Sequence, residues 1–145
     1  MATNQDADLI LKLYELRREP KLREARDWVA TQFRPKSAQD VVDTVMSEKG
    51  AYLRMVVSYW EMAAALVNHG SINAELFHDT NGEYLLVYAA IEPFIAGIRE
   101  QMGSPRMFRN LEKLVQESPE GREAIAWWQA RWKAEAEAKT STANA

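Results

Sequence analysis

The sequence contains no cysteine, which excludes disulfide bonds, thiolate catalysis and cysteine-ligated zinc or iron–sulfur centres. Only two histidines are present, His69 and His78, so few imidazole ligands are available to a metal. No apolar run approaches the roughly 20 residues of a membrane-spanning helix. The N-terminal residues also lack a basic segment followed by a long apolar one. We therefore expect a soluble, cytoplasmic protein without a membrane span.

An excess of positive charge is also missing. The 145 residues include 18 Lys and Arg against 21 Asp and Glu, a net charge of −3. Nucleic-acid binding requires a basic face, and the one basic run near the N-terminus is interrupted by acidic residues. Its members are Arg17, Arg18, Lys21, Arg23 and Arg26, and the interrupting residues are Glu15, Glu19, Glu24 and Asp27. We interpret this run as a solvated helix face and do not expect a nucleic-acid partner.

The composition that remains, 47% hydrophobic and 27% charged, is typical of a globular domain, and its apolar residues recur with helical spacing. The predicted helices span roughly 6–18, 20–33, a short segment after Ser37, 49–69, a turn after Asn73, 82–102, 105–117 and 119–139. No strand pattern with a hairpin turn is present. The sequence thus predicts an all-α, irregular helical bundle around a central antiparallel pair, 49–69 and 82–102. We expect residues 1–139 to form a single domain and residues 140–145 to be disordered.

Proline and glycine mark where the predicted helices begin and end. Serine followed by proline is typical of a helix start, so Ser104–Pro105 and Ser118–Pro119 each predict one. Gly70 and Gly103 stand where helices should stop. Pro93 lies inside the predicted 82–102 helix, where it removes a backbone donor and predicts a kink.

Metal chemistry has one weak candidate in this sequence. Glu75 and His78 form a Glu-x-x-His pair, which supplies two ligands on one helix face in di-iron carboxylate bundles. Glu61 and Glu92 would be the companion ligands. Such a site needs the Glu-x-x-His pair twice, however, and the chain contains it once. We therefore expect no metal and no cofactor, and keep these four residues as the site of an alternative, a metal-dependent or small-ligand enzyme.

Glu61 and Glu92 each lie in an otherwise apolar helix. A buried carboxylate is costly unless it is paired or hydrogen-bonded. The candidate partners are Arg54, Arg99, Arg106 and the hydroxyl groups of Tyr59 and Tyr88. No nucleophile or phosphate-binding glycine loop accompanies the carboxylates, so we predict structural buried pairs, with Arg99 included, and no catalytic residue.

Tryptophan is concentrated in the last predicted helix. Trp127 and Trp128 point about 100° apart, while Trp132 returns to the side of Trp128. One intrachain core should cover Trp128 and Trp132 and leave Trp127 on another surface. Exposed tryptophan is typical of interfaces, so these three residues are the candidate contact surface.

Four segments of the chain together resemble a bacterial family catalogued as domain of unknown function 4760. They are Leu13–Arg17, Glu24–Trp28, Tyr59–Phe77 and Ile91–Arg99. The resemblance rests on an aromatic–Glu pair, a helix of small residues, Gly70, Ile72 and an acidic–Leu turn, and it covers most of residues 9–100. It implies a helical protein and no assigned activity, so no catalytic residue follows from it. Our leading interpretation is an uncharacterised, non-enzymatic protein that acts by protein contact, as a homodimer or with another protein partner.

Overall fold

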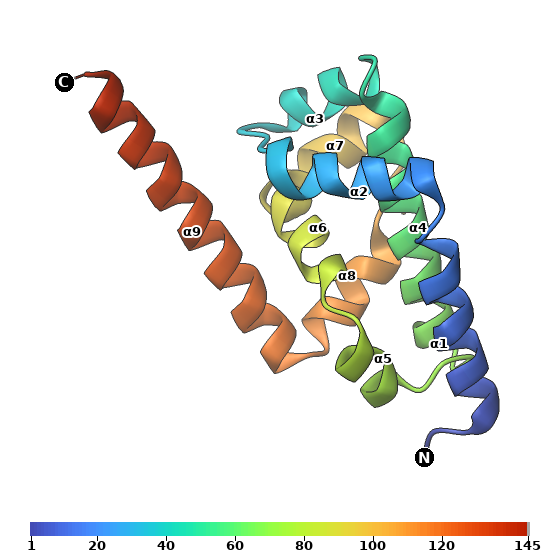
Figure 1. Cartoon of the computed structure of the whole chain (residues 1–145). Coiled ribbons are helices and arrows are strands. Elements are labelled where there is room, and N and C mark those ends of the chain that lie inside the picture. The colour runs from blue at the N-terminus through green and yellow to red at the C-terminus, as the bar shows by residue number, and fades with distance from the viewer. Residues whose placement is uncertain (145) are drawn as a thin grey trace.

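The computed structural model describes residues 1–144, and within that range all regular structure is helical. Its elements are α1 (Asn4–Leu16), α2 (Pro20–Gln32), α3 (Ala38–Val45), α4 (Gly50–Asn68), α5 (Ala74–Thr80), α6 (Glu83–Ile91), the 3₁₀ turn η1 (Glu92–Phe94), α7 (Ile95–Met102), α8 (Arg109–Gln116) and α9 (Pro119–Ala143). The predicted all-α class is confirmed. The helices pack as an irregular bundle (Figure 1).

Side chains close to the helix starts explain why most helices begin where they do. The side chains of Ser37, Asn73 and Ser118 accept hydrogen bonds from backbone N–H groups in the first turns of α3, α5 and α9. At the other end, Gly103 takes a left-handed conformation, φ 62°, immediately after α7. These boundaries therefore depend on local chemistry.

Helix α4 is at the centre of the bundle and packs most extensively against α2 and α8. Its buried residues are Gly50, Leu53, Val56, Tyr59, Trp60, Ala63, Ala64 and Val67. Helix α6 is almost entirely apolar and packs mainly on α9. Because α6 buries several sides, it shows little separation into an apolar and a polar face.

The break predicted at Pro93 is confirmed. Helix α6 ends at Ile91, η1 makes a single 3₁₀ turn, and α7 continues from Ile95. The break redirects α7 onto α3, where Gly97 lies against Ala38. A Cβ atom at Gly97 would approach the Ala38 Cβ to 2.7 Å, so this contact requires glycine.

One predicted helix start is wrong. Helix α8 begins at Arg109 rather than at Pro105. Ser104 is used instead to end α7, because its backbone N–H donates to the carbonyl of Arg99. Residues 105–108 form a turn that ends at Phe108, which has φ 64°, and this is the only positive φ of a non-glycine residue within residues 1–144.

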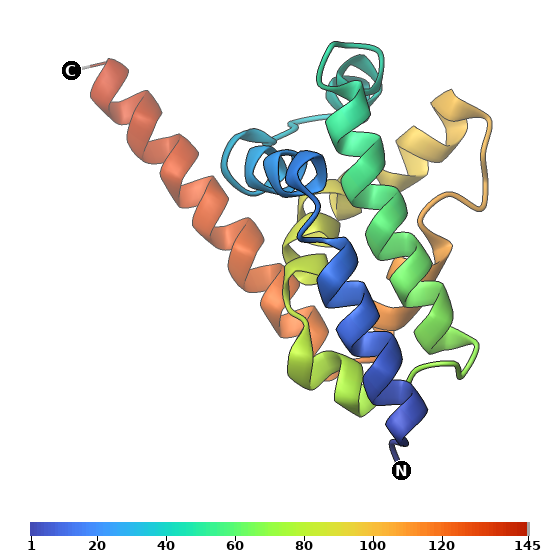
Figure 2. The ribbon, with the colours of Figure 1, turned by 45° about the vertical axis from the view of Figure 1, so that its right-hand side comes forward.

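Helix α9 forms one side of the molecule, and its C-terminal part stands clear of the other helices in both ribbon views (Figures 1 and 2). The helix includes residues 140–143, which belong to the segment expected from the sequence to be disordered, whereas residue 145 lies outside the described residues. No helix within residues 1–144 has the length and apolar character needed to cross a lipid bilayer.

Candidate functional site

The four candidate ligands lie at three separate places. Glu75 and His78 are on α5, Glu61 is on α4 and Glu92 is in η1. Glu92, expected to be buried, is exposed because the 3₁₀ turn places it at the rim, where its carboxylate accepts a 2.9 Å hydrogen bond from Gln129 Nε2. Within residues 1–144, no three histidine, aspartate or glutamate side chains come close enough to hold a metal ion. The structure therefore does not assemble these residues into a site.

Glu61 is half-buried and binds the start of α8. Its Oε1 accepts from the Asn110 backbone N–H at 2.8 Å and from Asn110 Nδ2 at 3.1 Å, and its Oε2 accepts from the Leu111 N–H at 2.9 Å. Phe108, which precedes α8, has no side-chain oxygen to do this. Glu61 thus supplies the cap from another helix, and its partners differ from the arginine and tyrosine side chains expected from the sequence.

Arg99 binds the turn formed by residues 105–108, which immediately precedes α8. Its Nε donates to the carbonyl of Met107 at 2.9 Å, and its guanidinium lies 3.3 Å from Glu112 of α8. Arg99 is half-buried, as is Glu112. Glu61 and Arg99 together hold the 103–108 segment between α7 and α8 and stabilise the unusual backbone of Phe108.

A cavity of about 330 Å³ lies beneath the 103–108 segment, bounded by α3, α4 and α7. Most of its lining is aliphatic or aromatic, and its polar groups are those of Arg54, Ser58, Glu61 and Arg106. This composition, an apolar space with a few polar groups at its edge, is typical of small-molecule sites. The cavity could not be identified from the sequence, because its walls combine two distant parts of the chain, residues 41–61 and residues 98–108.

A second polar cluster joins α1, α2, α4 and α6. Glu83 Oε2 accepts from Arg26 Nε at 2.8 Å and from Trp60 Nε1 at 3.2 Å. Arg26 also donates to the carbonyl of Arg17, and Arg17 donates to Asn81 at 2.9 Å. The sequence predicts Arg17 and Arg26 on a solvated face, whereas both are half-buried in the structure. The side chains of this cluster hydrogen-bond to one another and include no nucleophile, so we interpret the cluster as stabilising the bundle.

His78 is bonded to Tyr84 rather than positioned to bind a metal. Its Nδ1 lies 2.5 Å from the Tyr84 hydroxyl oxygen. Burial lowers the pKa of His78, although Glu120 and Asp79 act in the opposite direction. Burial also raises the pKa of Tyr84 to about 12, so this phenol stays protonated at neutral pH. The pair is therefore a neutral hydrogen-bonded contact between α5 and α6.

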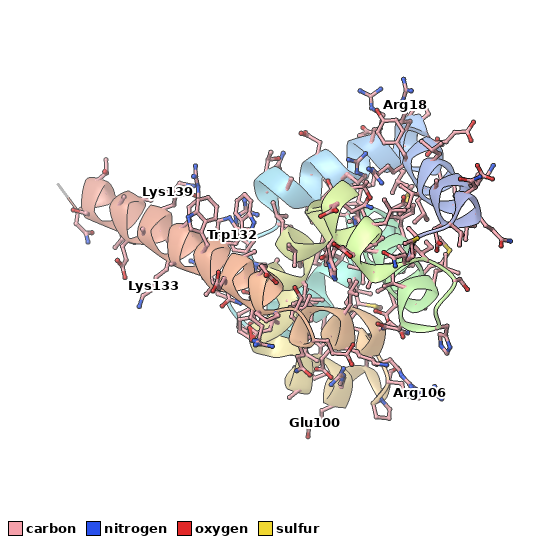
Figure 3. The ribbon with its side chains drawn as sticks, turned by 90° about the horizontal axis from the view of Figure 1, so that it is seen from below. Arg18, Glu100, Arg106, Trp132, Lys133 and Lys139 are labelled. Atoms are coloured by element: carbon pink, nitrogen blue, oxygen red, sulfur yellow. The ribbon has the colours of Figure 1, made fainter. Side chains whose placement is uncertain are left out.

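The three tryptophans of α9 divide as their spacing predicts. Trp128 and Trp132 are half-buried against the bundle, and the Arg34 guanidinium lies 4.4 Å from the centre of the Trp132 ring. Figure 3 shows Trp132 and Lys133 on opposite sides of α9. Trp127 is 55% exposed, and its only aromatic contact within residues 1–144 is an edge-to-face one with Trp128 at 4.9 Å.

Comparison with known proteins gives one match. Residues 2–118 match a protein family described as a domain of unknown function (DUF4760). The match ends immediately before α9, which begins at Pro119. Neither the curated proteins nor the solved structures include a match to this chain. Because the matched range covers most of the chain, including the turn held by Glu61 and Arg99, the protein belongs to the DUF4760 family.

Proposed function

We propose that this protein acts through protein–protein contact and that two copies associate through α9. The observation that carries the proposal is Trp127, a large aromatic side chain that is 55% exposed in the middle of a helix. Exposed tryptophan is unusual on a free surface and enriched at the centres of interfaces. The cytoplasmic location expected from the sequence stays part of this proposal.

The two sides of α9 support a partner on the outer side. Its inner side packs on the bundle through Gly121, Ile125, Trp128 and Trp132. Helical spacing places Trp127, Ala130 and Ala134 on the opposite side. Beyond Trp132 every described residue of α9 is exposed. A helix that extends this far from its own domain leaves a surface on which a second helix can pack.

The charges around Trp127 favour a second copy of this chain as the partner. Glu123 and Arg131 lie four residues before and after Trp127, and both are exposed. An antiparallel pair of α9 helices with its two-fold axis at Trp127 would bring Glu123 of each copy opposite Arg131 of the other. Arg131 already contacts Glu135 at 3.0 Å, but an exposed pair within a helix is weak and is readily exchanged.

The alternative of a metal-dependent enzyme gains no support from the geometry. Glu61 caps α8, Glu92 binds Gln129 and His78 binds Tyr84. Each side chain is therefore engaged with its own neighbour, and no shared site results.

Light scattering coupled to size exclusion tests the proposal. We expect the wild-type chain to be a dimer that Trp127→Ala weakens about thirtyfold, because an aromatic anchor at an interface centre contributes about 2 kcal/mol or more. Tyr14→Ala is the matched control, since Tyr14 is 50% exposed on α1 and lies beside Arg17, as Trp127 lies beside Arg131. A wild-type monomer at high protein concentration, or equal effects of the two substitutions, would contradict the proposal.

A further inference from the structure

The cavity beneath the 103–108 segment has the size and lining of a ligand site. Its volume of about 330 Å³ lies at the lower end of the range for small-molecule pockets, roughly 300–1,000 Å³. The apolar lining consists of Val41, Val42, Val45, Leu53, Val57, Ile98, Met102, Met107 and Phe108. Allowing about 30 Å³ for each group the size of a water molecule, the cavity holds about ten non-hydrogen atoms. A pocket with this predominantly apolar lining suits an apolar ligand group.

Two of the four polar residues that line the cavity are arginines. Arg54 and Arg106 both border it, both are exposed, and neither forms an ion pair within residues 1–144. Arg54 donates one hydrogen bond, at 3.2 Å, to the carbonyl of Val45, which leaves most of its N–H groups available. Figure 3 shows Arg106 at the edge of the molecule, away from the free end of α9. The single carboxylate in the lining, Glu61, is occupied by the start of α8.

Hydrogen bonds hold the backbone of residues 107–110 in place at one side of the cavity. Met107 and Phe108 contribute two of the apolar walls, and Phe108 takes a left-handed conformation that a bulky residue rarely adopts. The hydrogen bond that Arg99 donates to the Met107 carbonyl and the one that Glu61 accepts from the Asn110 N–H fix the segment on both sides of Phe108. Strained residues that are held from both sides are common where a protein binds a ligand.

From this geometry we propose that the cavity binds a medium-chain carboxylic acid, of about eight to ten carbons. The alkyl chain lies among the valine, leucine, isoleucine and methionine side chains, and the carboxylate pairs with Arg54 and Arg106 at the edge. Guanidinium groups bind carboxylates through two parallel hydrogen bonds, which makes arginine suited to this recognition. The proposal is independent of self-association, since α9 contributes no residue to the cavity.

Isothermal titration calorimetry with decanoate and the 145-residue chain tests this inference. We expect one decanoate to bind per chain, no binding of acetate, and binding of decanol about tenfold weaker, because decanol lacks the charge. No detectable decanoate binding would overturn the proposal. Equal affinities for decanol and decanoate would overturn the role of the arginines.

Three variants locate the site. Arg54→Met combined with Arg106→Met should weaken decanoate binding about tenfold or more, whereas Arg109→Met, an exposed arginine outside the cavity, should leave it unchanged. Val57→Phe should abolish binding by filling the cavity, and the arginine variants keep the test decisive if this variant does not fold. Equal decanoate affinity in all variants would place binding elsewhere and overturn the proposal. Occupation of the cavity by a side chain of a second copy of this protein would also overturn the proposal. That arrangement would be recognised by a dimer that Val57→Phe dissociates and that decanoate does not affect.

Discussion

Replacing Glu61 with glutamine tests whether one carboxylate fixes the start of α8. Glu61 accepts three hydrogen bonds of 2.8–3.1 Å from Asn110 and Leu111. Glutamine retains one acceptor oxygen and places an NH₂ group against backbone N–H groups, so at least one donor loses its partner. Hydrogen bonds to a charged group contribute about 1.5–3 kcal/mol, and the favourable interaction with the helix N-terminus adds about 0.3–1 kcal/mol. We expect Glu61→Gln to lower the free energy of unfolding by about 2 kcal/mol.

Urea denaturation followed by tryptophan fluorescence measures this loss. With a slope of about 2 kcal/mol per molar urea, the midpoint should fall by about 1 M while the slope stays unchanged. Glu100→Gln is the matched control, because Glu100 is exposed on α7 and forms no side-chain hydrogen bond or ion pair within residues 1–144. Equal midpoints for the Glu61 variant and the wild type would refute the capping role.

The contacts of Gly97, Trp132 and His78 can be tested in the same way. Gly97→Ala should lower the free energy of unfolding, measured by urea denaturation, by about 1–3 kcal/mol. The reason is that the new Cβ would approach the Ala38 Cβ to 2.7 Å. An unchanged urea midpoint would show that α3 and α7 separate freely. Trp132→Ala should speed amide hydrogen exchange in the middle of α9, because it removes the contact with Arg34. Exchange at the wild-type rate would mean that Trp128 alone holds α9 against the bundle. The pKa of His78 is lowered by burial, so the unfolded chain binds more protons than the folded chain below about pH 6.5. Stability should therefore decrease as the pH falls from 6.5 toward the lowered pKa, and His78→Gln should remove part of this dependence; a resonance of His78 titrating at or above 6.5 in an NMR experiment would contradict it.

Features set by a few neighbouring residues could be predicted from the sequence. Ser118–Pro119 begins α9, Asn73 begins α5 and Pro93 interrupts the 82–102 segment, because each acts through its own backbone or the next turn. The division between Trp127 and Trp128 followed from helical spacing alone. In each case the relevant contacts lie within about one helical turn.

Features that depend on distant partners could not be predicted in this way. Ser104–Pro105 has the same local pattern as Ser118–Pro119, yet α8 starts at Arg109 because Glu61, almost fifty residues earlier in the chain, supplies its cap. Burial of Glu92 was expected from its apolar neighbours, but the 3₁₀ turn rotates it to the rim. The cavity requires two distant parts of the chain to meet, and no short motif signals such a meeting.

Sedimentation equilibrium of charge-reversed α9 variants tests self-association through α9 most directly. In the proposed antiparallel pair, Glu123→Arg or Arg131→Glu alone places like charges opposite one another, and each should weaken the dimer. The two substitutions together restore opposite charges, so the double variant should associate about as tightly as the wild type. A wild-type chain that stays monomeric, or a double variant that associates more weakly than both single variants, would contradict self-association through α9.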